Sequence, residues 1–158
     1  IRGLYFFRIW FETAPVRALG LDVGSKTIGL ALMDEAGIAA HPHSVLARVG
    51  NSGDVAAVAT LVAEHAITDV VVGMPYELSG RVGHRGRQVQ TFMKVLAQAI
   101  APVPIHEQDE RFTTAEAERV LLDADLSRQK RKSVIDQQAA ALILQTWLDA
   151  YRKRTESR

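Results

Sequence analysis

The chain has 158 residues, 47% of them hydrophobic and 23% charged, which is an ordinary balance for one globular domain with a full core. It has no cysteine, which excludes disulfides and thiolate metal sites and fits a reducing, cytoplasmic location. No apolar run reaches the ~18 residues of a membrane span. The net charge is +1, so nucleic-acid binding cannot be inferred from the total and must rest on where the charges lie.

Residues 1–15 differ from the rest of the chain. They are rich in aromatic side chains, but charged residues interrupt the apolar stretch, which is too short for a secretory signal. We interpret them as an expression remnant or an accessory extension, with an extra element packed on the domain as the alternative. The domain is then expected over 16–152, followed by a basic tail over 153–158.

Hydrophobic periodicity and turn residues predict the remaining elements in chain order. They are strands over 16–23, 27–33 and about 37–46, a helix over 54–66, a buried strand over 70–75, a glycine-punctuated loop over 76–86, a helix over 87–100, a buried strand over 103–109, a helix opening at Thr113, a polar basic loop over 123–132 and a last helix over about 133–151. A hairpin meander followed by β-α-β units gives a mixed five-stranded sheet with helices on both faces. This is the ribonuclease H-like fold.

Acidic residues far apart in the sequence fall where this fold would bring them together. Asp22 ends the first strand, Asp109 and Glu110 end the last strand, and Asp136 lies on the apolar stripe of the last helix. Because side chains alternate along a strand, only one of Asp109 and Glu110 can share a face with the site, and the pattern does not choose between them. Converging carboxylates are costly unless a cation neutralises them, and a hard divalent cation is the simplest partner. The sequence therefore predicts metal-assisted chemistry on phosphate esters, and the mechanism expected for it uses two Mg²⁺ or Mn²⁺ ions.

Each acidic position also has a plainer interpretation. Asp22 followed by Gly24 is a common turn sequence, and Asp136 would be stabilised by the dipole of the helix that it begins. Asp109 or Glu110 would form a surface pair with Arg111. The acid-glycine pattern also opens sugar kinases and actin-like ATPases, but those proteins need two such domains and this chain is too short for both.

Basic residues gather in three clusters, and two of these flank the acidic positions in sequence. A metal centre for the scissile phosphate, with basic arms for its neighbours, is what a nuclease needs. The alternative is solvated surface loops and a polar tail. The candidates for nucleic-acid contacts are Lys26, Arg81, Arg85, Arg87, Arg111, Lys130, Arg131 and Lys132.

Four stretches, in order and at family-like spacing, resemble the bacterial YqgF/RuvX family of ribonuclease H-like proteins. They cover 21–31, 71–75, 109–117 and 132–144, and the match extends over about 16–150. The family is described as pre-16S rRNA nucleases and Holliday-junction resolvases. The resemblance implies Asp22, Glu110 and Asp136 as the catalytic and metal-binding acids, and so favours Glu110 over Asp109.

The resemblance also implies contacts with structured nucleic acid, either precursor rRNA or branched DNA, from the loop after Pro75 and the basic segment before Asp136. The sequence departs from the family in that loop, where Glu77 and Ser79 replace the usual Asn and Asp. A two-fold homodimer would suit the symmetry of a four-way junction. The competing hypothesis is a non-catalytic nucleic-acid-binding module with a vestigial metal site.

Overall fold

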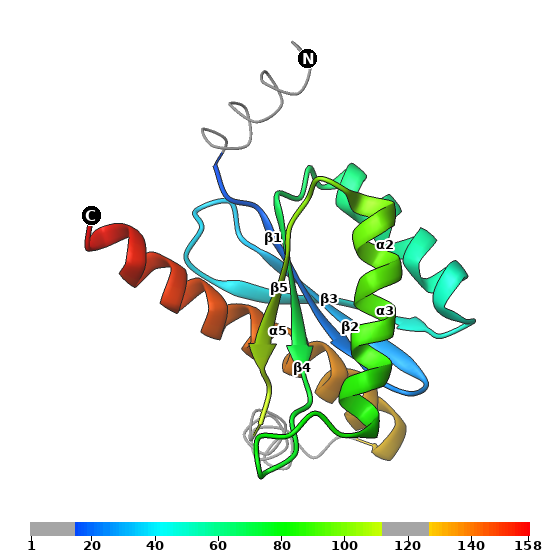
Figure 1. Ribbon diagram of the computed structural model, residues 1–158. Coiled ribbons are helices and arrows are strands. Elements are labelled where there is room, and N and C mark those ends of the chain that lie inside the picture. Colours follow the sequence, from blue (N-terminus) through cyan, green and yellow to red (C-terminus); the bar gives the residue numbers. More distant parts are fainter. Residues whose placement is uncertain (1–14, 112–126) are drawn as a thin grey trace.

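The computed structural model describes residues 15–111 and 127–158 (Figure 1). The predicted helix at Thr113 lies outside these residues, as does the extension except for Pro15. The described elements are β1 (Ala18–Val23), β2 (Thr27–Met33), β3 (Ala40–Ala47), α2 (Asn51–Glu64), β4 (Asp69–Met74), α3 (His84–Ile100), β5 (Ile105–Asp109) and α5 (Arg128–Glu156). Among the described residues, no helix is long and apolar enough to cross a membrane.

The five strands form one sheet in the order β3-β2-β1-β4-β5. The first three strands pair antiparallel, whereas β1 and β5 each pair parallel with β4, which lies between them. Helices α2 and α3 cover one face of the sheet and α5 covers the other (Figure 1). The predicted mixed sheet with helices on both faces is therefore confirmed.

Alternation along β1 divides the side chains between two cores. Leu19 and Leu21 pack with α2 and α3, whereas Ala18 belongs to the cluster under α5. Each fully buried leucine stabilises the fold by roughly 1.5–3 kcal/mol relative to an exposed one. Asp22 shares the period-two face of Ala18, so the strand that builds the core also directs this carboxylate toward α5.

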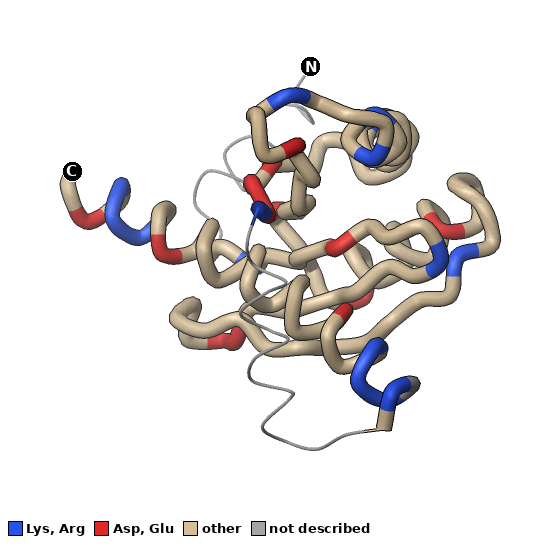
Figure 2. Tube along the Cα trace, turned by 90° about the horizontal axis from the view of Figure 1, so that it is seen from below, with Lys and Arg blue, Asp and Glu red and all other residues tan. Residues whose placement is uncertain are grey.

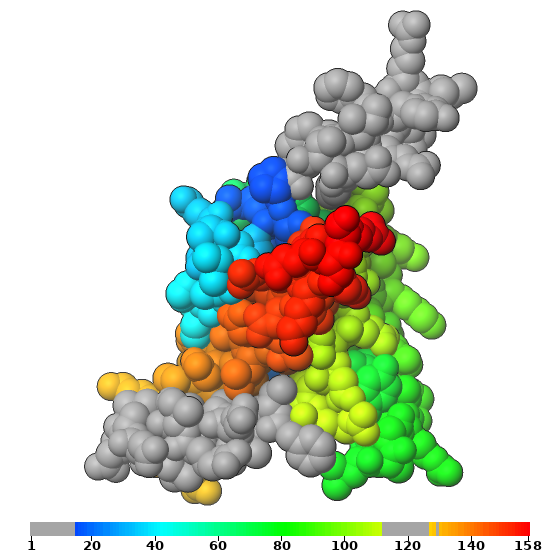
Figure 3. Space-filling model, turned by 90° about the vertical axis from the view of Figure 1, so that its left-hand side faces the viewer, coloured from blue at the N-terminus to red at the C-terminus, as the bar shows by residue number. Residues whose placement is uncertain are grey.

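Helix α5 crosses the sheet between β2–β3 and β5, as the orange-to-red helix in Figure 3 shows. Glycines beneath it permit a close approach. A Cβ at Gly29 would fall on the backbone carbonyl of Asp136, and a Cβ at Gly73 would meet the side chains of Ile143 and Glu110. These two positions thus let α5, from Asp136 to Ile143, approach the sheet closely near the end where β1, β4 and β5 finish.

Helix α5 is longer than predicted at both ends. It begins at Arg128, so the expectation of a basic loop over 123–132 is wrong for residues 128–132. It ends at Glu156, so most of the predicted basic tail is helical. Lys, Arg and Gln are good helix formers, and a stretch read as polar loop can extend a helix whose later turns are held by packing. The basic residues before Asp136 therefore stand on a regular helix.

Candidate active site

Asp22 and Glu110 meet at the carboxyl end of the parallel strands. β1 and β5 both run parallel to β4, so the carboxyl ends of the three strands lie at the same end of the sheet, the lower end in Figure 1. The backbone N–H of Glu110 donates to the carbonyl of Met74 at 3.3 Å, and the absence of a side chain at Gly73 leaves room for the Glu110 carboxyl. The Glu110 carboxyl is hydrogen-bonded to that of Asp22.

The charge state of this carboxyl pair is shifted strongly by its surroundings. Burial raises the pKa of Glu110 to about 8, and the neighbouring negative charge of Asp22 adds to the effect. Burial also raises the pKa of Asp22, with a further contribution from the charge of Asp136. The cation of Arg85 opposes both shifts. At neutral pH, Glu110 is therefore mostly protonated and shares its proton with Asp22.

Asp136 reaches the site from α5 on the facing layer. Its Oδ2 accepts a hydrogen bond of 2.7 Å from the hydroxyl of Thr27, on β2. Gly29, which touches the Asp136 backbone, pairs with Asp22 in the β1–β2 ladder. The three acids predicted from the sequence are thus brought to one end of the sheet from three different elements.

Asp109 is directed into a separate ion pair. Its Oδ2 lies 2.6 Å from Nη2 of Arg111 and 2.9 Å from its Nε, and the backbone N–H of Arg111 also donates to the carboxylate. These bonds hold the pKa of Asp109 below its ordinary value. The Arg111 guanidinium also lies over the ring of Tyr76, 5.9 Å from its centroid. Glu110, not Asp109, is the acid beside Asp22, and Arg111 is occupied by its neighbour.

The predicted nucleic-acid contacts divide into two groups around the acids. Lys26 is exposed in the β1–β2 turn, and Nη2 of Arg85 donates to the carbonyl of Val23 at 3.3 Å, next to Asp22. Arg81 lies in the exposed loop before α3, and Arg87 donates to the carbonyl of Val82 within the same region.

The second group is on α5. Lys130, Arg131 and Lys132 occupy its first turns, where Figure 2 shows a run of basic residues. This end of a helix carries the positive pole of the dipole, so cations gathered there raise the local positive potential. The acids therefore lie between basic residues of the β1–β2 turn and α3 on one side and of α5 on the other.

Sequence reasoning missed Thr27, which holds Asp136. The signal was present, because Thr27 and Gly29 share one face of β2 by period two, and Gly29 pairs with Asp22. It also assigned Glu77 to a substrate-facing loop. In the structure the Glu77 carboxyl packs against Gly83, the residue before α3, where it complements the positive end of that helix.

The donor chemistry fits a hard divalent cation. Asp22, Glu110 and Asp136 offer carboxylate oxygens, which Mg²⁺ and Mn²⁺ prefer, and burial raises the pKa values of Asp22 and Glu110 although Arg85 opposes the shift. Within the described residues, no three acidic, histidine or cysteine side chains are already grouped as metal ligands. Asp22 and Glu110 would therefore be the primary ligands, with Asp136 completing the set.

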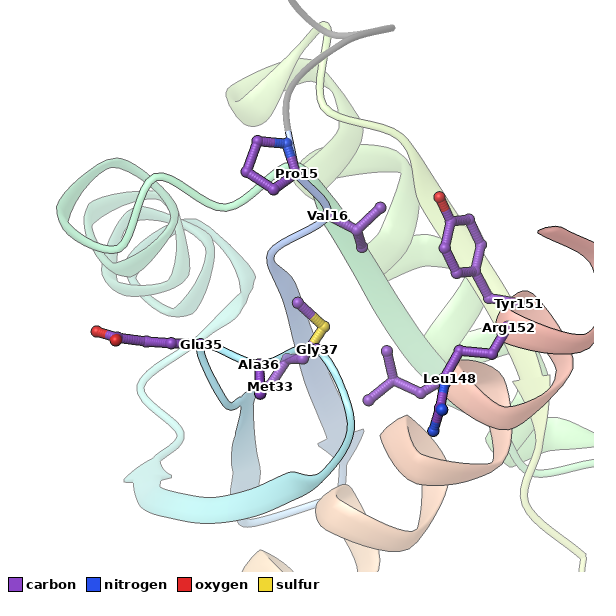
Figure 4. Close-up of a pocket in the computed structure, with 9 residues that line it drawn as sticks. All are labelled: Pro15, Val16, Met33, Glu35, Ala36, Gly37, Leu148, Tyr151 and Arg152. Atoms are coloured by element: carbon purple, nitrogen blue, oxygen red, sulfur yellow. The ribbon is translucent and has the colours of Figure 1, made fainter. Parts of the chain in front are cut away.

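A hollow lies at the end of the molecule opposite the candidate site, between the start of β1, the β2–β3 turn and the end of α5 (Figure 4). It has a volume of about 320 Å³. Val16, Met33, Leu148 and Tyr151 turn toward it, whereas Glu35 extends away. These walls are mainly apolar, so this hollow lacks the converging acids that mark the candidate site.

The pKa of Glu110 leads to a prediction about pH and stability. A carboxyl whose pKa rises from 4.5 in the unfolded chain to about 8 in the fold stabilises the protein below pH 4.5, and this contribution is lost as pH rises toward 8. Between pH 6 and pH 9, we expect the free energy of unfolding of the metal-free protein to fall, and that of Glu110→Gln to fall less. The variant should melt several degrees higher at pH 9, roughly 5 °C.

Asp109→Asn is the matched control in this experiment. The pKa of Asp109 is lowered, so the group is ionised in both states throughout this pH range, and its loss should lower the melting temperature equally at pH 6 and pH 9. Added Mg²⁺ should reduce the difference in melting temperature between wild type and Glu110→Gln at pH 9, because the cation binds the ionised pair of Asp22 and Glu110. Parallel pH curves for wild type and Glu110→Gln would contradict the assignment.

Known proteins resemble this chain over most of its length. The family model described as "RuvX: Holliday junction resolvase" matches residues 16–150. A protein of Myxococcus xanthus named "Putative pre-16S rRNA nuclease" is 44% identical over 137 residues, which cover 87% of this chain and 90% of that protein. A protein of Moorella thermoacetica with the same name is 46% identical over 134 residues, covering 85% and 95%.

Two solved structures share the fold. T. thermophilus RuvC in complex with a Holliday junction substrate gives a TM-score of 0.54 at 16% identity and covers 89% of this chain and 96% of that one. The fowlpox virus resolvase in complex with Holliday junction DNA gives 0.54 at 10% identity, covering 86% and 99%. At such identities the likeness shows the fold, and it confirms the predicted ribonuclease H-like class.

Proposed function

This chain belongs to the RuvX family, described as Holliday junction resolvases, and we propose that it is a divalent-metal-dependent nuclease acting on structured nucleic acid. The observation that carries the proposal is the hydrogen-bonded pair of Asp22 and Glu110, with pKa values raised by burial, beside Asp136. Buried carboxyl groups at a strand end are costly, and a bound cation offsets that cost. The relatives' name and the solved resolvase complexes support nucleic acid as the substrate.

Each residue has a distinct role in this proposal. Asp22 and the ionised form of Glu110 would hold Mg²⁺ or Mn²⁺, and Asp136 would complete the ligand set. When bound, two such ions would activate water and stabilise the leaving oxygen of a phosphodiester. Arg85 limits repulsion between the acids, and Lys26 is placed to contact a phosphate next to the scissile one.

The basic residues at the start of α5 are proposed to hold the other side of the substrate. Lys130, Arg131 and Lys132 would bind backbone phosphates without reading sequence, so affinity should fall steeply with salt. The proposed location is the cytoplasm. A two-fold dimer would present two such sites to the symmetric strands of a four-way junction.

The proposed role of Thr27 as a positioning residue gives a further prediction. Thr27→Val keeps the shape of the side chain but removes the hydroxyl that binds Asp136. We expect kcat to fall about tenfold with KM little changed, because groups that orient metal ligands typically contribute 10–100-fold. Thr27→Ser, which retains the hydroxyl, should restore most of the rate. An equal fall in kcat for Thr27→Val and Thr27→Ser would indicate that Thr27 has a packing role instead.

The proposal is tested by a parallel cleavage assay. A precursor 16S rRNA leader, a four-way DNA junction and linear duplexes are each incubated with Mg²⁺, Mn²⁺ or chelator. Metal-dependent cleavage of one structured substrate supports the nuclease and identifies its biology, as rRNA processing or as recombination and repair. Tight binding without cleavage under every condition would favour the binding module, the alternative consistent with the lack of a preformed group of three ligands in the described residues.

A further inference from the structure

A polar pocket lies beside the β1–β2 turn, on the side of the sheet covered by α2 and α3. Its volume is about 260 Å³. It is lined by Ser25 from the turn, Arg48 and Asn51 from the start of α2 and the segment before it, and Gln88 and Thr91 from α3. The lining combines one cation with four neutral polar side chains and no carboxylate. We call it the turn pocket.

The guanidinium of Arg48 is fixed in the wall of the turn pocket by three hydrogen bonds. Nε donates to Oδ2 of Asp54 at 2.9 Å, Nη1 donates to the carbonyl of Gly24 at 3.0 Å, and Nη2 donates to Oδ1 of Asn51 at 2.6 Å. The guanidinium also lies over the ring of Phe92, 5.6 Å from its centroid. Asp54 is only 2% exposed, and it also accepts from the backbone N–H of Val49. A cation held this rigidly loses little entropy when it binds an anion.

These bonds leave several N–H donors of Arg48 and Asn51 uncommitted. The acceptors around Arg48, including the Asn51 oxygen, are already used by the guanidinium, so the NH₂ end of the Asn51 amide remains for another group. Arg48 has five N–H donors, of which these bonds use three. The Ser25 hydroxyl and the Gln88 amide add further donors. The charge of Arg48 is balanced by Asp54, so the pocket offers hydrogen-bond donors more than net positive charge, and such donors with no carboxylate in the lining suit phosphate oxygens.

The turn pocket is also close to the candidate active site. Ser25 follows Asp22 by three residues, so the chain between them spans at most about 11 Å. Consecutive nucleotides of one strand in B-form DNA are ~3.4 Å apart along the helix axis. The two consecutive carbonyls after Asp22 are held from α3 by Arg85 and from the turn pocket by Arg48. A strand whose scissile phosphate lies at the acids would thus pass the pocket within a few nucleotides.

We propose that the turn pocket binds a backbone phosphate of the substrate strand, one to three nucleotides from the scissile bond. This inference rests on the proposed nuclease function and adds a second anchoring point to it. Such an anchor would fix the register of the strand relative to Asp22 without reading its sequence.

Gln88→Glu is the variant that tests this inference. Gln88 is exposed on α3, so the change should leave folding intact while it places a negative charge against the proposed phosphate. Gln98→Glu makes the same change at another exposed position of the same helix, and ten residues at 1.5 Å per residue separate the two by about 15 Å. That distance exceeds the Debye length of about 10 Å at 0.1 M salt, so the control should bind like wild type.

Affinity is measured with Asp22→Asn in the background, on a substrate strand in which one phosphate at a time is replaced by a neutral methylphosphonate. We expect Gln88→Glu to weaken binding about tenfold and to reduce the slope of log affinity against log salt concentration by up to about one. Gln98→Glu should bind like the parent protein. At one position, one to three nucleotides from the cleavage site, a methylphosphonate should weaken binding to the parent protein but have little effect on binding to Gln88→Glu.

The other outcomes separate failure of the pocket from failure of the function. The pocket is not a strand subsite if Gln88→Glu and Gln98→Glu bind the substrate with equal affinity. The same conclusion follows if each methylphosphonate has the same effect on the parent protein and on Gln88→Glu. In both cases the nuclease proposal stands. If inorganic phosphate binds in the pocket and the nucleic-acid strand does not, the pocket is a site for free phosphate, and the inference is wrong. If the parent protein binds no nucleic acid at all, the proposed function itself fails.

Discussion

Asp22→Asn should abolish cleavage while leaving the fold intact. The substitution keeps the shape of the side chain but removes the charge that would anchor the metal ions. Metal stabilisation of transition-state charge is worth several kcal/mol, so we expect the rate to fall by about a thousandfold or more. The pKa of Asp22 is raised by burial and by Asp136, which means that ionisation opposes folding at this position. The melting temperature of the metal-free variant should therefore equal or exceed that of wild type.

Rates are measured with the substrate that wild type cleaves, with circular dichroism and thermal melts as the folding check. Asp109→Asn is the matched control for loss of a carboxylate at the same end of the sheet. Because Asp109 is paired with Arg111, that variant should retain most of its activity while losing some stability. Full activity of Asp22→Asn, or equal inactivation of both variants, would remove Asp22 from its assigned role.

Gly29→Ala should have the largest effect on stability. A Cβ at this position would overlap the backbone carbonyl of Asp136, which belongs to a helix and cannot rotate away. Helix α5 would have to shift, and overpacking of this kind costs about 3 kcal/mol. For a chain of this size the melting temperature should fall by roughly 10 °C. Cleavage should fall as well, because the shift moves Asp136 away from Asp22.

Gly53→Ala is the control for this substitution. Gly53 lies in α2, and its added methyl would meet only the end of the Val49 side chain, which can move. Because alanine is the better helix former, this variant should be as stable as wild type or more stable by about 0.5–1 kcal/mol. If Gly29→Ala were as stable as Gly53→Ala, the close contact between β2 and α5 would not be a real constraint.

Much of the fold could be predicted because its elements carry strong periodic signals. The apolar run of β4 and the hairpin turn at Gly24 follow directly from hydrophobic pattern and turn chemistry. The start of α5 could not, since residues 128–132 are all polar in sequence, and their helicity depends on the packing of later turns. Helix boundaries set by tertiary contacts leave little trace in local composition.

The candidate site shows a similar division. The apolar pattern placed Asp22 at the end of the first strand, but side-chain alternation could not choose between Asp109 and Glu110. That choice depends on the Arg111 ion pair and on the space above Gly73, which are properties of the folded chain. The ion pair of Arg48 and Asp54 was not predicted, because α2 begins between the two residues and each has an ordinary surface interpretation.

The central claim is that Asp22, Glu110 and Asp136 together hold the metal ions, and manganese anomalous diffraction tests it most directly. Crystals of the protein would be soaked with Mn²⁺ above pH 8, where Glu110 is ionised. We predict an anomalous peak between Asp22 and Glu110 at ligand distances of about 2.0–2.2 Å, with Asp136 turned toward it and no peak in Asp22→Asn. A peak elsewhere, or none in a protein that cleaves in the presence of Mn²⁺, would contradict the assignment.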